Sequence, residues 1–177
     1  MIFFIPNILT KEECKYLSEQ FDIERKYNAS MDSGYAKTNI SYGFEPSFAF
    51  NTYLDKLKSK VLECDPNLDD LLNVNTFIRE YINTSTLAKH IDRKDIGVTM
   101  SICLESTINK DWPLCAQIEG KEYCFNTNVG DAIVLFDADK NPHWRNTLEC
   151  EKTERVIQFF LHWKPVNYIR KKTKSLL

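Results

Sequence analysis

The chain has 177 residues, of which 43% are hydrophobic and 27% are charged, as in an ordinary globular domain. This length suffices for one domain with a buried core. The formal net charge of −2 gives no overall positive field, so nucleic acid is disfavoured as a partner. No apolar segment is long enough to cross a bilayer, so we expect no membrane contact.

The chain begins with an apolar segment, residues 1–5, that stops at Pro6. It has no positive leader and no small-residue cleavage site, so we interpret it as a short first strand and not as a secretory signal. The six cysteines contain no Cys-x-x-Cys spacing, which disfavours a zinc knuckle or a thioredoxin-like redox site. Without an export signal, we expect a cytoplasmic protein with reduced thiols.

The first part of the chain has helical patterns. Residues 7–22 predict a helix, because Thr10 is a good N-cap and Glu13 completes a capping box. Residues 24–45 predict a long irregular loop of the kind that covers a site or moves. Residues 46–63 predict a second helix with one apolar face.

From residue 73 onward the pattern changes to short strands separated by turn-forming residues, with Glu119-Gly120 placed as a tight hairpin turn. Helices followed by strands indicate an α+β domain built on a β-sandwich or open barrel. We expect a single domain over 1–177, with a helical part at about 1–72, a barrel core at about 73–165 and a basic tail at 166–177. The predicted strands are 73–82, 97–104, 112–118, 121–126, 131–136 and 153–163.

Three residues are of the types that bind metal ions: His90, Asp92 and His143, the last 53 positions after His90. On a strand, residues two apart point to the same face, so His90 and Asp92 can reach one ion. Two imidazoles and one carboxylate occupy one face of an octahedral iron(II) and leave the other face open. The alternatives are that His90 is a surface residue and that His143 is a packed core histidine. His162 is interpreted as structural.

Several segments resemble one family in their order and spacing. They are residues 5–14 (IPNILTKEEC), Tyr81 nine residues before His90, residues 128–132 (NVGDA), and Arg155 twelve residues after His143. Together with the metal triad they resemble the prolyl 4-hydroxylase-like branch of the 2-oxoglutarate- and iron(II)-dependent oxygenases. The resemblance implies a double-stranded β-helix, a jelly-roll or cupin-like barrel, with N-terminal helices packed on one sheet. It also implies His90, Asp92 and His143 as catalytic metal ligands, with iron(II) and 2-oxoglutarate as cofactors and ascorbate as a candidate addition.

The distal carboxylate of 2-oxoglutarate calls for a fixed cation, and arginine offers a planar fork for a carboxylate. Arg155 starts an apolar strand and shares parity with Ile157 and Phe159, so we expect it to face the barrel interior and anchor the co-substrate. The alternative for Arg155 is a surface salt bridge. Arg145, two residues after His143, is the rival anchor, and Tyr81 is expected to donate a hydrogen bond to the same carboxylate.

The resemblance implies hydroxylation of an unactivated C–H bond, coupled to conversion of 2-oxoglutarate to succinate and carbon dioxide. The expected substrate is a prolyl residue in a peptide, by analogy with the family, or a free amino acid or other small molecule. Two alternatives stay open: a non-catalytic cupin-like binding module, and a zinc hydrolase that uses the same three ligands. The sequence gives no indication of the oligomeric state.

Overall fold

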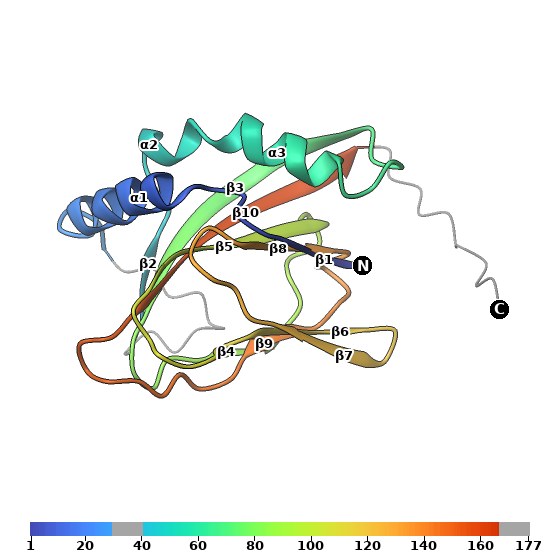
Figure 1. Cartoon of the computed structure of the whole chain (residues 1–177). Helices are drawn as coiled ribbons and strands as arrows, with labels where there is room; N and C mark the ends of the chain where they lie inside the picture. The colour runs from blue at the N-terminus through green and yellow to red at the C-terminus, as the bar shows by residue number, and fades with distance from the viewer. Residues whose placement is uncertain (30–40, 167–177) are drawn as a thin grey trace.

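The computed structural model describes residues 1–29 and 41–166. Two antiparallel sheets face each other, and the helices cover the outer face of the larger sheet (Figure 1). The helices are α1 (Lys11–Glu24), α2 (Phe48–Asn51) and α3 (Leu54–Leu62). The larger sheet contains, in spatial order, β1 (Ile2–Ile5), β8 (Ala132–Phe136), β5 (Val98–Ser106), β10 (Val156–Val166), β3 (Asp70–Tyr81) and β2 (Ser41–Phe44). The smaller sheet contains β4 (Leu87–His90), β9 (His143–Arg145), β6 (Leu114–Ile118) and β7 (Lys121–Phe125).

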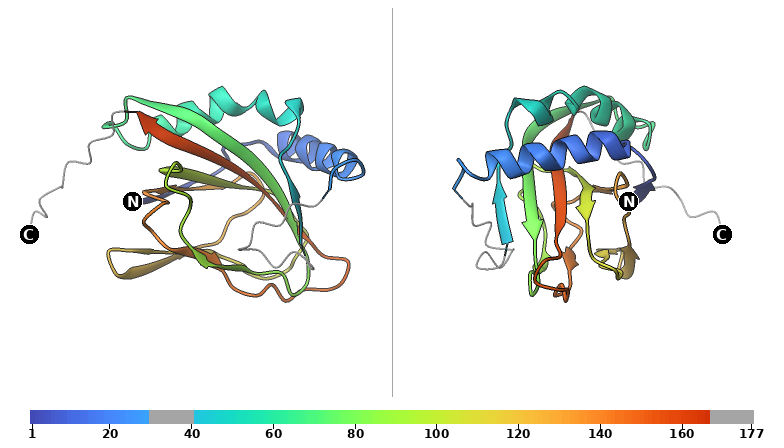
Figure 2. Two further views of the ribbon diagram at one scale, coloured as in Figure 1. Left: turned by 180° about the vertical axis from the view of Figure 1, so that it is seen from behind. Right: turned by 60° about the vertical axis from the view of Figure 1, so that its left-hand side comes forward.

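This arrangement is the double-stranded β-helix that the sequence predicts. From β3 onward the chain passes back and forth between the two sheets, so that strands distant in sequence become neighbours. One consequence is that β9 pairs with β4 and β6, although these three strands belong to separate parts of the chain. The side views in Figure 2 show the helical layer on one side of the barrel and the smaller sheet on the other.

Helix α1 begins where its capping signal predicts. Thr10 accepts a hydrogen bond from the Glu13 backbone, and the Glu13 side chain accepts one from the Thr10 backbone. This pairing satisfies two N–H groups that a helix start otherwise leaves without partners. The apolar side of α1, including Leu17 and Phe21, is buried on the larger sheet. The predicted helix over 46–63 is divided into α2 and α3.

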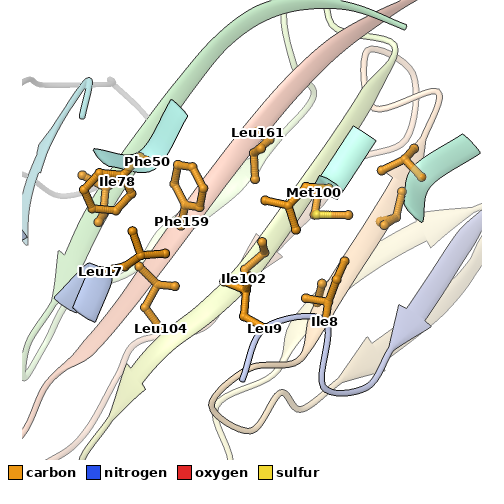
Figure 3. Packing of buried hydrophobic residues seen from close by; sticks show 14 of the residues in the cluster. Ile8, Leu9, Leu17, Phe50, Ile78, Met100, Ile102, Leu104, Phe159 and Leu161 are labelled. Atoms are coloured by element: carbon orange, nitrogen blue, oxygen red, sulfur yellow. The ribbon is translucent and has the colours of Figure 1, made fainter. Parts of the chain in front are cut away.

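The two faces of β10 have different roles. Ile157, Phe159 and Leu161 are fully buried in the core between the larger sheet and the helices, where Phe159 packs against Phe50 of α2 (Figure 3). The alternate residues, such as Phe160 and His162, line a cavity inside the barrel. The strongly apolar face of this strand is therefore the face that packs against the helices.

Some further features differ from the sequence prediction. Residues 41–44 of the predicted loop form β2, while residues 30–40 of that loop and 167–177 of the basic tail lie outside the described residues. The short strands β4 and β9 have no separate prediction. The expectation of reduced thiols is wrong for one pair: Cys115 and Cys124 are directly opposite on β6 and β7 and form a disulfide.

Among the described helices, none has the length and apolar character needed to cross a membrane.

Candidate metal centre

The barrel brings His90, Asp92 and His143 together. His90 is the last residue of β4, His143 is the first residue of β9, and the two are register partners across these strands. Asp92 lies just beyond β4, where its backbone N–H donates to the Ala138 carbonyl. Strand pairing therefore removes the long sequence separation between the two histidines.

The potential ligand atoms of the triad converge on one point. The Nε2 atom of His90 and the Nε2 atom of His143 each lie 3.7 Å from Asp92 Oδ1. The two imidazole rings are 4.3 Å apart between centroids. One ligand atom from each residue lies within 4.8 Å of the other two, so the three side chains could hold a single metal ion.

Hydrogen bonds behind the triad orient each ligand. The Nδ1 atom of His90 bonds the Ala88 carbonyl at 2.8 Å, and the Nδ1 atom of His143 bonds the Asn141 carbonyl at 3.1 Å. A ring nitrogen that faces a carbonyl must be the protonated one, so the lone pair is on Nε2, which faces the centre. The Thr99 hydroxyl donates to Asp92 Oδ2 and leaves Oδ1 toward the histidines.

The protonation states suit metal binding. Burial tends to raise the pKa of Asp92, but the neighbouring His90, His143 and His162 rings and the Thr99 hydroxyl lower this pKa to about 2. Burial lowers the pKa of His143, which favours the neutral ring. A carboxylate and neutral imidazoles are the forms that bind a metal ion, and mixed nitrogen and oxygen ligands suit iron, manganese or zinc.

The triad lies in the wall of a cavity of about 290 Å³ between the two sheets. The predicted site residue Tyr81 lies in the same cavity wall and is buried, and burial raises its pKa. The rest of the lining combines apolar side chains with a few polar ones; it includes Asn75, Phe77, Arg79, Leu114, Phe160 and His162.

Arg155 does not face this cavity, so the prediction that it points into the barrel is wrong. Its guanidinium is bonded to acidic side chains on α1, β3 and β5: it donates to Asp22 at 2.7 and 2.9 Å, to Glu105 at 2.6 and 3.0 Å, and to Glu80 at 3.2 Å. These bonds raise the pKa of Arg155 above its ordinary value. The residue joins helix α1 to the larger sheet.

The prediction was wrong because the apolar face of β10 packs against the helices and does not line the barrel interior. Arg155 shares parity with Ile157 and Phe159, as the sequence indicates, but these residues pack toward the helices. A sheet covered by helices is apolar on that face, while a face that lines a polar cavity is mixed. The apolar alternation in the sequence therefore identified the helix-covered face and not the barrel interior.

Arg145, the rival anchor, has the environment that was expected of Arg155. It is two residues after His143 on β9, and its side chain is only 1% exposed. Its Nη1 donates to the Trp112 carbonyl at 2.7 Å, and the guanidinium lies over the Trp112 ring. Its Nε and Nη2 atoms have no hydrogen-bond partner in the described part of the chain. Tyr81 packs edge-on against the same Trp112 ring, which brings the two predicted residues to one place.

Two unpaired nitrogen atoms on a buried guanidinium are costly, and burial lowers the pKa of Arg145 accordingly. Arg145 also borders a second, polar cavity of about 360 Å³, whose lining includes Gln158 of β10 and Cys103 of β5. This environment fits a bound anion, and a planar carboxylate could satisfy both free nitrogens.

Among the cavity residues to which the sequence prediction gave no role in the site are Asn75, Arg79 and His162. Arg79 and Asn75 lie on β3 with the same parity as Tyr81, which was the available signal. His162 was interpreted as structural because its parity opposes that of Arg155. Since Arg155 faces outward, the opposite parity places His162 in the cavity wall.

Comparison with known proteins supports the fold. No protein-family model and no curated protein sequence matches the chain. Among solved structures, a prolyl-4-hydroxylase from Pseudomonas putida has a TM-score of 0.67 and 14% identity, over 92% of each chain. A viral collagen prolyl hydroxylase from Paramecium bursaria Chlorella virus-1 has a TM-score of 0.68 and 12% identity, over 93% of this chain and 96% of that one. HygX from Streptomyces hygroscopicus, with nickel and 2-oxoglutarate bound, has a TM-score of 0.69 and 12% identity, over 94% and 83%.

All three structures have the double-stranded β-helix fold that the sequence resemblance implies. The resemblance seen in the sequence is therefore confirmed at the level of the fold, over nearly the whole chain. At such low identity the likeness carries no residue roles, and the chemistry has to be argued from the site itself.

Proposed function

We propose that this protein is an iron(II)- and 2-oxoglutarate-dependent oxygenase that hydroxylates an unactivated C–H bond. The observation that carries the proposal is the convergence of His90 Nε2, His143 Nε2 and Asp92 Oδ1, with each ligand held by a hydrogen bond from behind. Two histidines and one carboxylate on one side of an ion leave open positions on the other side. Bound iron would supply the activation of oxygen at those positions.

We assign the co-substrate anchor to Arg145 in place of Arg155. Residues two apart on a strand are separated by about 6.6 Å, a distance comparable with the length of a five-carbon diacid. A 2-oxoglutarate that reaches from the metal triad toward Arg145 could pair its distal carboxylate with the free Nε and Nη2 atoms. Tyr81, which contacts the same tryptophan as Arg145, is proposed to assist. Arg79, on the wall of the triad cavity, is the competing anchor.

The remaining cavity residues have a shielding role in this proposal. Phe77, Phe160 and Leu114 give the cavity apolar walls. Such walls limit the entry of water and strengthen the electrostatic interactions inside the site. The hydroxyl of Thr99 keeps Asp92 in one orientation while the open positions of the metal exchange their ligands.

Two substrate classes fit this reaction. One structural neighbour is a prolyl hydroxylase from Trichoplax adhaerens in complex with a peptide fragment of hypoxia-inducible factor. Another is HygX with hygromycin B bound. A prolyl residue in a peptide and a small molecule such as a free amino acid are therefore both candidate substrates for this chain.

The test is iron binding together with succinate formation. With iron(II), 2-oxoglutarate, molecular oxygen, and ascorbate as the candidate reductant, the protein is expected to produce succinate and carbon dioxide. Asp92→Asn is expected to weaken iron binding at least tenfold, because it removes the only charged ligand of the triad. The matched control is Asp95→Asn, since Asp95 lies in the same loop, is exposed and bonds Arg93.

Two other functions make different predictions. A non-catalytic cupin-like module would bind no iron tightly and produce no succinate. A zinc hydrolase with the same ligands would be indifferent to 2-oxoglutarate, and it would have no use for the buried, partly unpaired Arg145. Full iron affinity in Asp92→Asn would refute the triad assignment itself.

A further inference from the structure

A pair of polar side chains on the larger sheet is left without hydrogen-bond partners. Asn75 on β3 and His162 on β10 are register partners across neighbouring strands. The Asn75 Oδ1 and His162 Nδ1 atoms are both buried, and neither has a hydrogen-bond partner among the described residues. Each such atom costs roughly 1–3 kcal/mol of stability.

Both residues line the triad cavity. The metal triad belongs to β4, β9 and the loop after β4, whereas Asn75 and His162 belong to strands of the larger sheet that faces them (Figure 1). His162 lies beside the triad, because its register partner on β5, Thr99, donates to Asp92, so a molecule bound next to the triad would also meet the unpaired polar atoms. Neither residue has a role in the reaction as proposed above.

The chemistry of these atoms limits what they can bind. An amide oxygen only accepts hydrogen bonds, so Asn75 Oδ1 needs an N–H or O–H donor from the ligand. A neutral histidine nitrogen can donate or accept according to its tautomer. Two unpaired atoms on adjacent strands thus favour a ligand with at least two polar groups close together.

A negative charge lies at the rim of the same cavity. Glu45 follows β2, is exposed, and has no ion pair within 1–29 and 41–166. The other exposed charged residue of the lining, Arg93, is already bonded to Asp95, and the buried cation of the lining, Arg79, donates to the Ser41 hydroxyl. The uncompensated rim charge is therefore acidic and favours a cationic group such as an ammonium.

We propose that Asn75, His162 and Glu45 form the substrate subsite, and that the substrate is a small polar molecule carrying a free amino group, of the amino acid or amino sugar class. This inference rests on the proposed oxygenase function. The apolar lining of the cavity would receive the carbon–hydrogen part of the molecule, and the amino and hydroxyl groups would pair with Asn75, His162 and Glu45. The cavity volume of about 290 Å³ suits a molecule of this size.

A prolyl residue within a peptide fits these atoms poorly. Its ring carries no N–H and no hydroxyl before reaction, so it offers no donor to Asn75. A peptide would also bring no ammonium group to Glu45, except at an N-terminus. The polar wall and the acidic rim therefore favour the free small molecule over the peptide.

The experiment measures binding to the full chain loaded with zinc(II) and 2-oxoglutarate, which prevents turnover. The probes are the twenty free L-amino acids and glucosamine, each beside its N-acetyl derivative, together with a prolyl-containing peptide; binding is measured by calorimetry. At least one free amine is expected to bind, with its N-acetyl form at least tenfold weaker.

Variants then test the residues. Asn75→Leu is expected to weaken that binding by roughly tenfold, because the ligand donor loses its acceptor. It is also expected to leave the melting temperature of the ligand-free protein unchanged or higher, since it removes an unpaired buried oxygen. Glu45→Gln is expected to weaken binding two- to fivefold, as removal of an exposed charge does. The control Glu12→Gln removes an exposed acid on α1 and is expected to change nothing.

The results separate this inference from the proposed function. If the iron(II)–2-oxoglutarate complex forms but no free amine binds, or if the prolyl peptide binds equally well to wild type and Asn75→Leu, the subsite is wrong and the oxygenase proposal stands. If amines bind in an Asn75-dependent way but no such complex forms, the oxygenase proposal is wrong and the amine site stands.

Discussion

Arg145 and Arg155 show how the partners of a residue determine its role. Arg155 has acidic partners from three elements, and its charge is fully compensated. Arg145 is more deeply buried, and among the described residues its partners are a carbonyl and a tryptophan ring, with two nitrogen atoms left without a hydrogen bond. A residue that lacks partners inside the protein is the one available to a ligand.

Arg145→Met and Arg155→Met form a matched pair of variants. Arg145→Met is expected to leave the melting temperature unchanged or higher, because burying an unpaired charge is costly, and to weaken 2-oxoglutarate binding at least tenfold. Arg155→Met is expected to lower the free energy of unfolding by about 1–3 kcal/mol, because Asp22 and Glu105 lose their bonds to Arg155 and Glu80 keeps its pair with Arg25 alone, with 2-oxoglutarate binding retained. Calorimetry and thermal unfolding measure the two quantities. If instead Arg155→Met weakens 2-oxoglutarate binding and Arg145→Met lowers the free energy of unfolding, Arg155 is the anchor.

The buried ring of His162 predicts a pH dependence of stability. Burial lowers its pKa from 6.5 to about 4. Between these two values the unfolded chain binds a proton that the folded chain does not, so the free energy of unfolding falls as the pH falls from 6.5 toward 4. With a chelator present, His162→Phe is expected to remove about 1–3 kcal/mol of that fall. If the free energy of unfolding falls with pH equally in the wild type and in His162→Phe, His162 is exposed in solution.

At the scale of elements, the turn before β8 joins the start of α1 to the larger sheet. Gly130 has a φ of +93°, and its carbonyl accepts a hydrogen bond from the Leu9 backbone. The Asp131 carboxylate accepts hydrogen bonds from the Asn7 and Asn128 backbones. This contact explains why the two segments recognised in the sequence, 5–14 and 128–132, occur together: they pack against each other.

Gly130→Ala tests this contact, because a Cβ at this position would lie 2.5 Å from the Leu9 carbonyl oxygen. We expect it to lower the free energy of unfolding by about 2 kcal/mol or more, from backbone strain and the clash together. Gly120→Ala is the control: its φ is +80°, but no atom lies within 4 Å of the added Cβ, so only the strain of about 1 kcal/mol applies. Thermal unfolding compares the two. Equal losses would mean that the contact with Leu9 contributes little.

The sequence predicted most elements from signals that act locally. The capping box at Thr10 and Glu13, the turn at Glu119-Gly120 and the strand patterns of β3, β5 and β8 all correspond to the structure. Local geometry determines such features, so one segment of sequence is enough to predict them. The predictions failed where strands are short or where their pairing is set by distant partners, as for β2, β4 and β9.

At the scale of the whole molecule, the triad could be proposed from residue types and resemblance, whereas the choice of the co-substrate anchor depends on tertiary packing. Residue types and spacing pointed to His90, Asp92 and His143 as a candidate metal site, because the chemistry of such a site restricts its ligands to few residue types, and the family resemblance of the surrounding segments favoured them over a surface or core histidine. The choice between Arg145 and Arg155 needed the knowledge of which face of β10 the helices cover. That knowledge is tertiary, because Arg155 meets Asp22 across 133 positions of sequence.

The most direct test of the central claim is an anaerobic titration of the protein with iron(II) followed by 2-oxoglutarate, observed by visible absorption. We expect a charge-transfer band that requires both additions, reaches its maximum at one equivalent of each, and is absent in His143→Ala. Bound iron that gives no band with 2-oxoglutarate, or a band that persists unchanged in His143→Ala, would contradict the account.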